Sequence, residues 1–154
     1  MRLSVHFRLL LTATLFAAAT LPALAETADG VNARIDNLLG HHALYETTIN
    51  AFQQAVATGS KEDVAAFVRY PIMVAINGHK TAIRSAEAFL KNYDAIMTPA
   101  IIGVIKAQKY EDLFVNDQGV MFGRGEAWVD GICLDRKCKQ SVVKVVTLQD
   151  APAP

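Results

Sequence analysis

The chain has 154 residues, and its 15 Lys and Arg balance 15 Asp and Glu. This balance, without any basic tract, argues against nucleic acid as a partner, because nucleic-acid-binding proteins neutralise phosphates with clustered cations. A membrane span needs about 20 apolar residues. Only the N-terminus approaches that length, so we expect no membrane span in the rest of the chain.

The first 25 residues are typical of a secretory signal peptide. Arg2 and Arg8 supply positive charge, residues 9–21 are apolar except for three threonines, and Ala23-Leu24-Ala25 is a small-x-small cleavage pattern. The apolar run is shorter than a membrane span requires. The basic residues before it and the cleavage pattern after it are typical of an export signal. We therefore predict cleavage before Glu26 and export, most simply to a bacterial periplasm. The residue at the cleavage point is Glu26 and not a Cys, so we expect no lipid anchor.

Removing 25 of 154 residues leaves 129, the size of one domain with one hydrophobic core. Residues 26–40 are predicted to be a flexible or short-helical lead-in to that domain. The domain itself is predicted over residues 41–149, and residues 150–154 are predicted to be a disordered tail.

Helical periodicity dominates the first half of this domain. Apolar residues three and four positions apart predict a long helix over 41–57, which Gly59 ends. The buried stripe of this helix is predicted to be Tyr45, Ile49, Phe52 and Val56. Further helices are predicted over 31–39, from Ser60 until Pro71 interrupts, and over 85–97, whereas 101–107 fits a helix or a strand.

Strand patterns dominate the second half. Strands are predicted over 72–76 and 79–83, and Asn77-Gly78 between them is a strong hairpin signal. Three more strands, over 113–115, 120–129 and 141–148, are predicted to form an antiparallel meander. Helices that precede a meander predict an α+β fold with its helices packed on one face of a curved sheet.

The two cysteines, Cys133 and Cys138, are predicted to form a disulfide. The segments 125–132 and 140–148 look like strands, so the thiols would face each other across a four-residue loop. A metal site would need more thiolates or imidazoles nearby, and a redox pair usually has two intervening residues. An exported protein favours the structural disulfide over both alternatives.

One predicted strand carries a row of polar and aromatic residues. A period of two places Phe122, Arg124, Glu126, Trp128 and Asp130 on one face. Two interpretations stay open for this face. It is either a solvated or dimer-forming surface, or a pocket wall on which Glu126 is a general base. The first is favoured, because charged side chains are rarely buried unless paired.

Tyr93 and His79 are the other acid–base candidates. Tyr93 falls on the apolar stripe of its helix, which favours a core tyrosine. His79, with Lys80 and Arg84, either forms a positive rim for an anionic ligand or keeps an exposed hairpin soluble. The chain has no nucleophile elbow, no phosphate-binding glycine loop and no zinc-binding His-Glu-x-x-His. We therefore predict no cofactor and no metal site.

The order of elements resembles the cone-shaped superfamily of nuclear transport factor two, which includes SnoaL-like and ketosteroid isomerase-like proteins. The resemblance spans roughly residues 43–148. It rests on that order, on the Asn77-Gly78 hairpin between the helices, and on the strand Gly123 to Trp128. It implies a cone-shaped, cystatin-like α+β fold with a pocket between helices and sheet, and dimerisation through sheet faces. The tyrosine and carboxylates with which isomerase-like relatives stabilise an enolate are not reproduced at recognisable positions.

No pattern in the chain fixes a reaction. We therefore expect an exported, soluble, non-catalytic binding or protein-interaction module that holds a small apolar ligand or docks a protein partner, with a homodimer as one assembly. The alternative is a cofactor-free isomerase or dehydratase that acts on a small apolar substrate. In that case Glu126, Tyr93 and His79 are the catalytic candidates.

Overall fold

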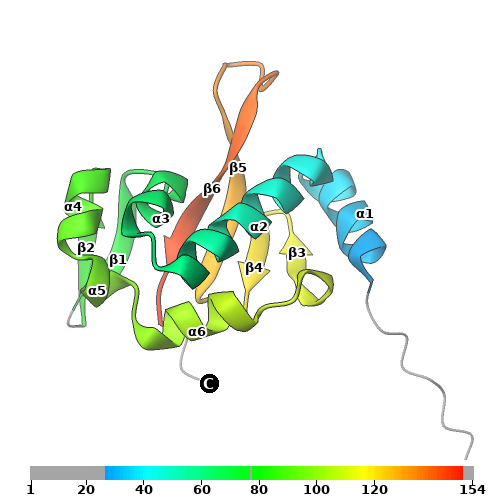
Figure 1. Cartoon of the computed structure of the whole chain (residues 1–154). Coiled ribbons are helices and arrows are strands. Elements are labelled where there is room, and N and C mark those ends of the chain that lie inside the picture. The colour runs from blue at the N-terminus through cyan, green and yellow to red at the C-terminus, as the bar shows by residue number, and fades with distance from the viewer. Residues whose placement is uncertain (1–26, 77, 151–154) are drawn as a thin grey trace, which may run out of the picture.

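The computed structural model describes residues 27–76 and 78–150 (Figure 1). It is an α+β structure with two antiparallel sheets, in which helices precede a two-stranded hairpin, more helices follow, and a four-stranded meander ends the chain. This confirms the predicted α+β class. The predicted signal peptide and residues 151–154 of the predicted tail lie outside the described residues. Asp150 is described, and its carboxylate accepts a hydrogen bond of 3.1 Å from the Thr98 hydroxyl.

The first helix, α1 (Ala28–Leu38), belongs to the core. Thr27 caps it by accepting a 3.2 Å hydrogen bond from the Gly30 N–H. Val31 and Ile35, one helical turn apart, are completely buried, and α1 packs against α2 and the start of the meander. Residues 26–40 were expected to be a flexible or short-helical lead-in. The helical form is observed, over residues 28–38, and its two apolar residues pack against the core because they share one face.

The second and third helices form as their sequence signals predict. In α2 (His42–Thr58) the expected stripe of Tyr45, Ile49, Phe52 and Val56 is buried, and Gly59 ends the helix with a φ of 72°. In α3 (Lys61–Phe67) the Ser60 hydroxyl accepts from the Asp63 N–H. The chain leaves α3 at Val68, which forms a parallel bridge to Val145.

The hairpin β1 (Ile72–Ile76) and β2 (His79–Ile83) pairs in the predicted antiparallel register. The prediction of a single helix over 85–97 is wrong in one respect, because the structure has two helices there, divided at Asn92. The Asn92 side chain donates to the Ala88 carbonyl oxygen at 2.8 Å and so ends the first piece. The ambiguous segment 101–107 is helical. The helical elements here are α4 (Ala86–Lys91), α5 (Tyr93–Ile96), α6 (Pro99–Ala107) and the short 3₁₀ helix η1 (Tyr110–Asp112).

The second sheet is a meander of four strands in chain order, β3 (Phe114–Asn116), β4 (Gly119–Phe122), β5 (Ala127–Cys133) and β6 (Ser141–Leu148). The single strand predicted over 120–129 is wrong, because a turn at residues 123–126 divides it. Gly123 and Gly125 take φ values of 61° and 116° there, which side chains with a Cβ rarely adopt. Arg124 and Glu126 therefore do not share a strand face with Trp128.

The helices α2, α3 and α6 lie on the same side of the four-stranded sheet (Figure 1). Apolar side chains fill the space between them and the sheet. Phe52 of α2 lies at the centre, with its ring 5.8 Å from that of Phe67 and 6.0 Å from that of Phe122, both edge-on. Within the described residues, no helix is both long and apolar enough to cross a membrane.

Candidate functional site

Glu126, the first acid–base candidate, organises the turn between β4 and β5. It is 5% exposed and is the only buried charged side chain among the described residues. Its Oε2 accepts a hydrogen bond of 2.6 Å from the Arg124 N–H. A Cβ at Gly123 would collide with this carboxylate and with Val104 of α6. The carboxylate therefore takes the place of a backbone carbonyl oxygen as the acceptor for the Arg124 N–H in this turn.

Tyr93 is a core residue, in agreement with its place on the apolar stripe. Its ring lies 5.8 Å from that of Phe89, and the Lys61 ammonium lies 4.9 Å from its centroid. Lys61 also pairs with Asp94 at 2.7 Å on the exposed side of α5. Burial raises the pKa of the Tyr93 phenol, so the hydroxyl keeps its proton at neutral pH.

His79 is exposed at the start of β2, at the tip of the hairpin. Among the described residues, no hydrogen bond or ion pair joins any two of His79, Tyr93 and Glu126, which come from three separate elements. The same part of the chain holds no group of three or more His, Cys, Asp and Glu that could bind a metal ion. The three candidates therefore do not form a common constellation.

The outer face of the meander, opposite α2 and α6, carries a row of neighbouring side chains. Phe114 pairs with Met121, Met121 with Trp128, and Trp128 with Thr147, so the row crosses all four strands. Directly paired residues point to the same face of a sheet. Phe114 is 51% exposed, and its ring lies 6.5 Å from that of Trp128. These four residues are called the outer row below.

A groove lies beside the outer row, between the facing edges of β1 and β6. Its volume is about 600 Å³. Val146 and Thr147 line it from β6, Met73 and Val74 line it from β1, and Lys80 adds one cation at its rim. Met73 is 57% exposed. Trp128 lines a smaller cavity of about 300 Å³ together with Val146 and Thr147, so the groove begins where the outer row ends.

The β5–β6 hairpin extends beyond the helices and carries the disulfide near its tip (Figure 1). Cys133 and Cys138 are bonded, with their Cα atoms 4.7 Å apart, which confirms the predicted pairing. The geometry differs from the expectation, because Cys133 pairs in the sheet with Ser141 and Cys138 lies within the loop. The disulfide therefore closes the loop on itself instead of joining two strands.

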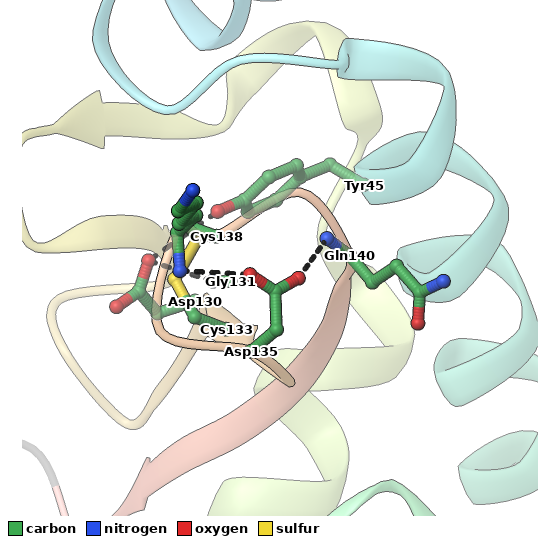
Figure 2. Close-up of a disulfide and its surroundings, with 8 residues drawn as sticks. Tyr45, Asp130, Gly131, Cys133, Asp135, Cys138 and Gln140 are labelled. Carbon is green, nitrogen blue, oxygen red and sulfur yellow. Dashed lines mark hydrogen bonds between the residues drawn. A yellow bond between two sulfur atoms is a disulfide. The ribbon is translucent and has the colours of Figure 1, made fainter.

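A carboxylate inside the loop organises its backbone (Figure 2). Asp135 accepts hydrogen bonds from the Lys137 N–H at 2.7 Å and the Gln140 N–H at 2.8 Å. These backbone donors lower the pKa of the Asp135 carboxyl, the Gln140 N–H most. The carboxylate is thus charged at neutral pH and holds the two ends of the loop.

The base of the same hairpin is tied to α2 through Tyr45 (Figure 2). The buried Tyr45 hydroxyl donates to Asp130 Oδ1 at 3.3 Å, and the Gly131 N–H donates to the same oxygen at 2.7 Å. Burial, followed by the nearby Asp130 charge, raises the pKa of Tyr45 to about 12. Disulfide, Asp135 and Tyr45 together hold the projecting hairpin in one shape.

We found no family model, no curated protein and no solved structure that matches the chain. The resemblance to the cone-shaped superfamily therefore stays a prediction from the sequence.

Two surface features escaped the sequence analysis. The outer row was missed because the row predicted along one strand included Arg124 and Glu126, which lie in the turn. Cross-strand neighbours depend on register, and only the corrected turn at 123–126 sets that register. The second missed feature is the cluster of cations at the hairpin tip. In the sequence, Arg136 and Lys137 lie between the two cysteines and Lys139 follows the second. A basic loop closed by a disulfide could have been taken as a signal for a binding surface.

Proposed function

We propose that this chain is an exported, non-catalytic protein-interaction module, and that its outer row binds a second copy of the same chain. The observation that carries this proposal is the largely apolar outer row, in which Phe114 is 51% exposed. An exposed apolar patch on a sheet face is typical of a protein–protein contact. Aromatic side chains such as Phe114 and Trp128 are common anchors of such contacts.

A second copy fits this face because the ridge and the groove lie side by side on it. Phe114 and Trp128 form the ridge, and Met73 and Val146 line the groove one strand further along. In a two-fold contact the same patch serves both partners, so each ridge can enter the groove of the other chain. Both features carry apolar side chains, so such a contact would remove apolar surface of both chains from water.

The filled interior supports a non-catalytic role. A cone-fold enzyme needs a cavity between helices and sheet, whereas here the completely buried rings of Phe52 and Phe122 lie 6.0 Å apart within that space. The buried carboxylate of Glu126 is engaged by the Arg124 N–H. The alternative of a cofactor-free isomerase or dehydratase would require this carboxylate to leave its turn and reach a substrate.

We also propose that the fold is the cone of the nuclear transport factor two superfamily and that the chain is exported. The order of helices, hairpin, helices and meander supports the first, together with the bridge that brings Val68 to β6. The charged and apolar leader up to Ala25 supports the second, and the disulfide fits an oxidising compartment.

The test is the oligomeric state of the chain from Glu26 onward, measured by analytical ultracentrifugation over a range of concentrations. We expect a dimer that Phe114→Glu converts to a monomer, because a charge would enter an apolar contact. Leu38→Glu is the matched control, since Leu38 of α1 is also 51% exposed but lies outside the outer row. A monomeric wild type at every concentration, or equal effects of the two variants, would contradict the proposal.

The groove favours a second candidate, the binding of a small apolar ligand. Its volume of about 600 Å³ and its lining by Met73, Val74 and Val146 suit such a ligand. Native mass spectrometry of the exported protein would detect a bound molecule. Loss of that molecule in Met73→Glu, with Leu38→Glu unchanged, would place it in the groove.

A further inference from the structure

We propose that the tip of the β5–β6 hairpin, residues 133–140, docks an acidic segment of another protein and inserts Leu134 into an apolar pocket on it. This surface is separate from the outer row and is held out beyond the helices (Figure 1). The proposal therefore does not depend on whether the chain dimerises.

The tip carries a cluster of positively charged side chains that form no ion pair with other described residues. Arg136, Lys137 and Lys139 accompany a single acid, Asp135, in this segment. All residues from 133 to 140 are exposed, and none of the three cations forms an ion pair with a carboxylate of the described residues. Asp135 forms its hydrogen bonds with backbone N–H groups and offsets one of the three charges, so the segment keeps a net positive charge. The tip therefore presents three cations to a partner.

Leu134 gives the tip an apolar anchor among these cations. It is 60% exposed, the highest fraction among the exposed large apolar side chains of the described residues. Its N–H donates to the Gln140 carbonyl oxygen at 2.8 Å, so its backbone is fixed across the loop while its side chain is exposed. An exposed leucine on a fixed backbone gains free energy when it enters an apolar pocket on a partner, because its apolar surface is removed from water.

The rigidity of the loop favours a protein over a membrane surface as its partner. The disulfide, the Asp135 hydrogen bonds and the Tyr45 contact at the base all fix the loop before binding. Pre-organisation strengthens binding to a partner of defined shape. A lipid surface gains little from a fixed loop shape, and one leucine with three cations gives it only weak attachment.

The distribution of charge over the chain favours approach of an acidic partner to the hairpin tip. Outside residues 133–140, the described chain has 10 basic and 13 acidic residues, so an acidic partner is repelled by the body and attracted by the tip. Opposite charge steers association and selects the docking surface. The partner surface is therefore expected to combine Asp and Glu side chains with a pocket for one aliphatic side chain.

The experiment uses a phage-displayed library of random peptides, selected on the immobilised mature chain after depletion on a variant with Arg136, Lys137 and Lys139 changed to Glu. We expect the selected peptides to be enriched in Asp, Glu and large apolar residues. Synthetic copies should bind the triple variant on the order of tenfold more weakly, since exposed ion pairs each contribute a modest amount. Leu134→Ala and the double variant Cys133→Ser, Cys138→Ser should also weaken binding.

The matched control is a triple variant in which Lys91, Lys106 and Lys109, all exposed on the helical side, are changed to Glu. It changes the net charge equally and should leave peptide binding unaltered, and circular dichroism checks that both triple variants are folded. Peptides without acidic enrichment, or equal losses in the two triple variants, would overturn the proposal. So would tip-dependent binding to phosphatidylglycerol vesicles without any peptide binding, which would identify a membrane surface as the partner.

Discussion

At the residue scale, the turn at 123–126 shows a carboxylate whose geometry serves the fold. Glu126 Oε2 accepts from the Arg124 N–H in a partly buried turn, and the space beneath it is open only because residue 123 is glycine. We expect Glu126→Gln to have a free energy of unfolding close to that of the wild type, because the glutamine amide oxygen can accept the same hydrogen bond. Glu126→Ala should lower the free energy of unfolding by about 1–3 kcal/mol, because the N–H loses its partner.

Urea unfolding monitored by Trp128 fluorescence measures both Glu126 variants. Gly123→Ala is the companion variant, which should destabilise the chain by a similar amount, because it forces a left-handed conformation and a collision with the carboxylate. A Glu126→Ala variant as stable as the wild type would show that the carboxylate does not hold the turn.

One buried and two partly buried tyrosines predict a loss of stability at alkaline pH. Burial raises the pKa of Tyr45, Tyr70 and Tyr110 to about 12, above the ordinary value of 10.0. Below the ordinary value the phenols are protonated in both states. Above it the unfolded chain loses protons that the folded chain keeps, so the free energy of unfolding should fall as the pH rises from about 10 to 12. Urea unfolding across this range should show a shallower fall for Tyr45→Phe than for the wild type. An identical slope would contradict the role of Tyr45.

At the element scale, the β5–β6 hairpin is stabilised by its disulfide. The double variant Cys133→Ser, Cys138→Ser should remain folded, because the core contains neither cysteine. A short closed loop contributes on the order of 2 kcal/mol in the chain-entropy model. Each kcal/mol shifts the melting of a domain of this size by roughly 3–6 °C. Calorimetry of the wild type with and without reductant, against the double variant, measures the effect. Equal melting temperatures would show that the disulfide does not contribute to global stability.

The same scale shows what the sequence can predict. The α2 stripe, the end of α2 at Gly59 and the β1–β2 hairpin follow from local spacing, and the structure confirms them. The turn at 123–126 was missed because Gly123 and Gly125 alternate with Arg124 and Glu126. The sequence therefore keeps the period of two that is typical of a strand throughout the turn. The outer row was missed for the same reason, since its members meet only through pairing across four strands. The disulfide could be predicted from compartment and spacing, but its place within the loop could not.

At the scale of the whole molecule, the buried contacts of α1 predict that the domain begins with this helix. Val31 and Ile35 are completely buried against the rest of the core, and Thr27 caps their helix directly after the predicted cleavage point. A chain that begins at His41 should therefore lose about 3–6 kcal/mol of stability, from two buried aliphatic side chains. A chain that begins at Thr27 is the control, because it keeps the cap and the helix.

Urea unfolding of these two chains separates a packed helix from a lead-in. The double variant Val31→Ala, Ile35→Ala in the full mature chain isolates the apolar contacts from the loss of chain length, and it should reproduce most of the destabilisation. Equal stability of the chains that begin at Thr27 and at His41 would restore residues 26–40 to a lead-in outside the domain. A large loss in the shorter chain with little loss in the double variant would instead assign the stabilisation to polar contacts of α1, such as the 2.8 Å bond from the Tyr110 hydroxyl to Asn32.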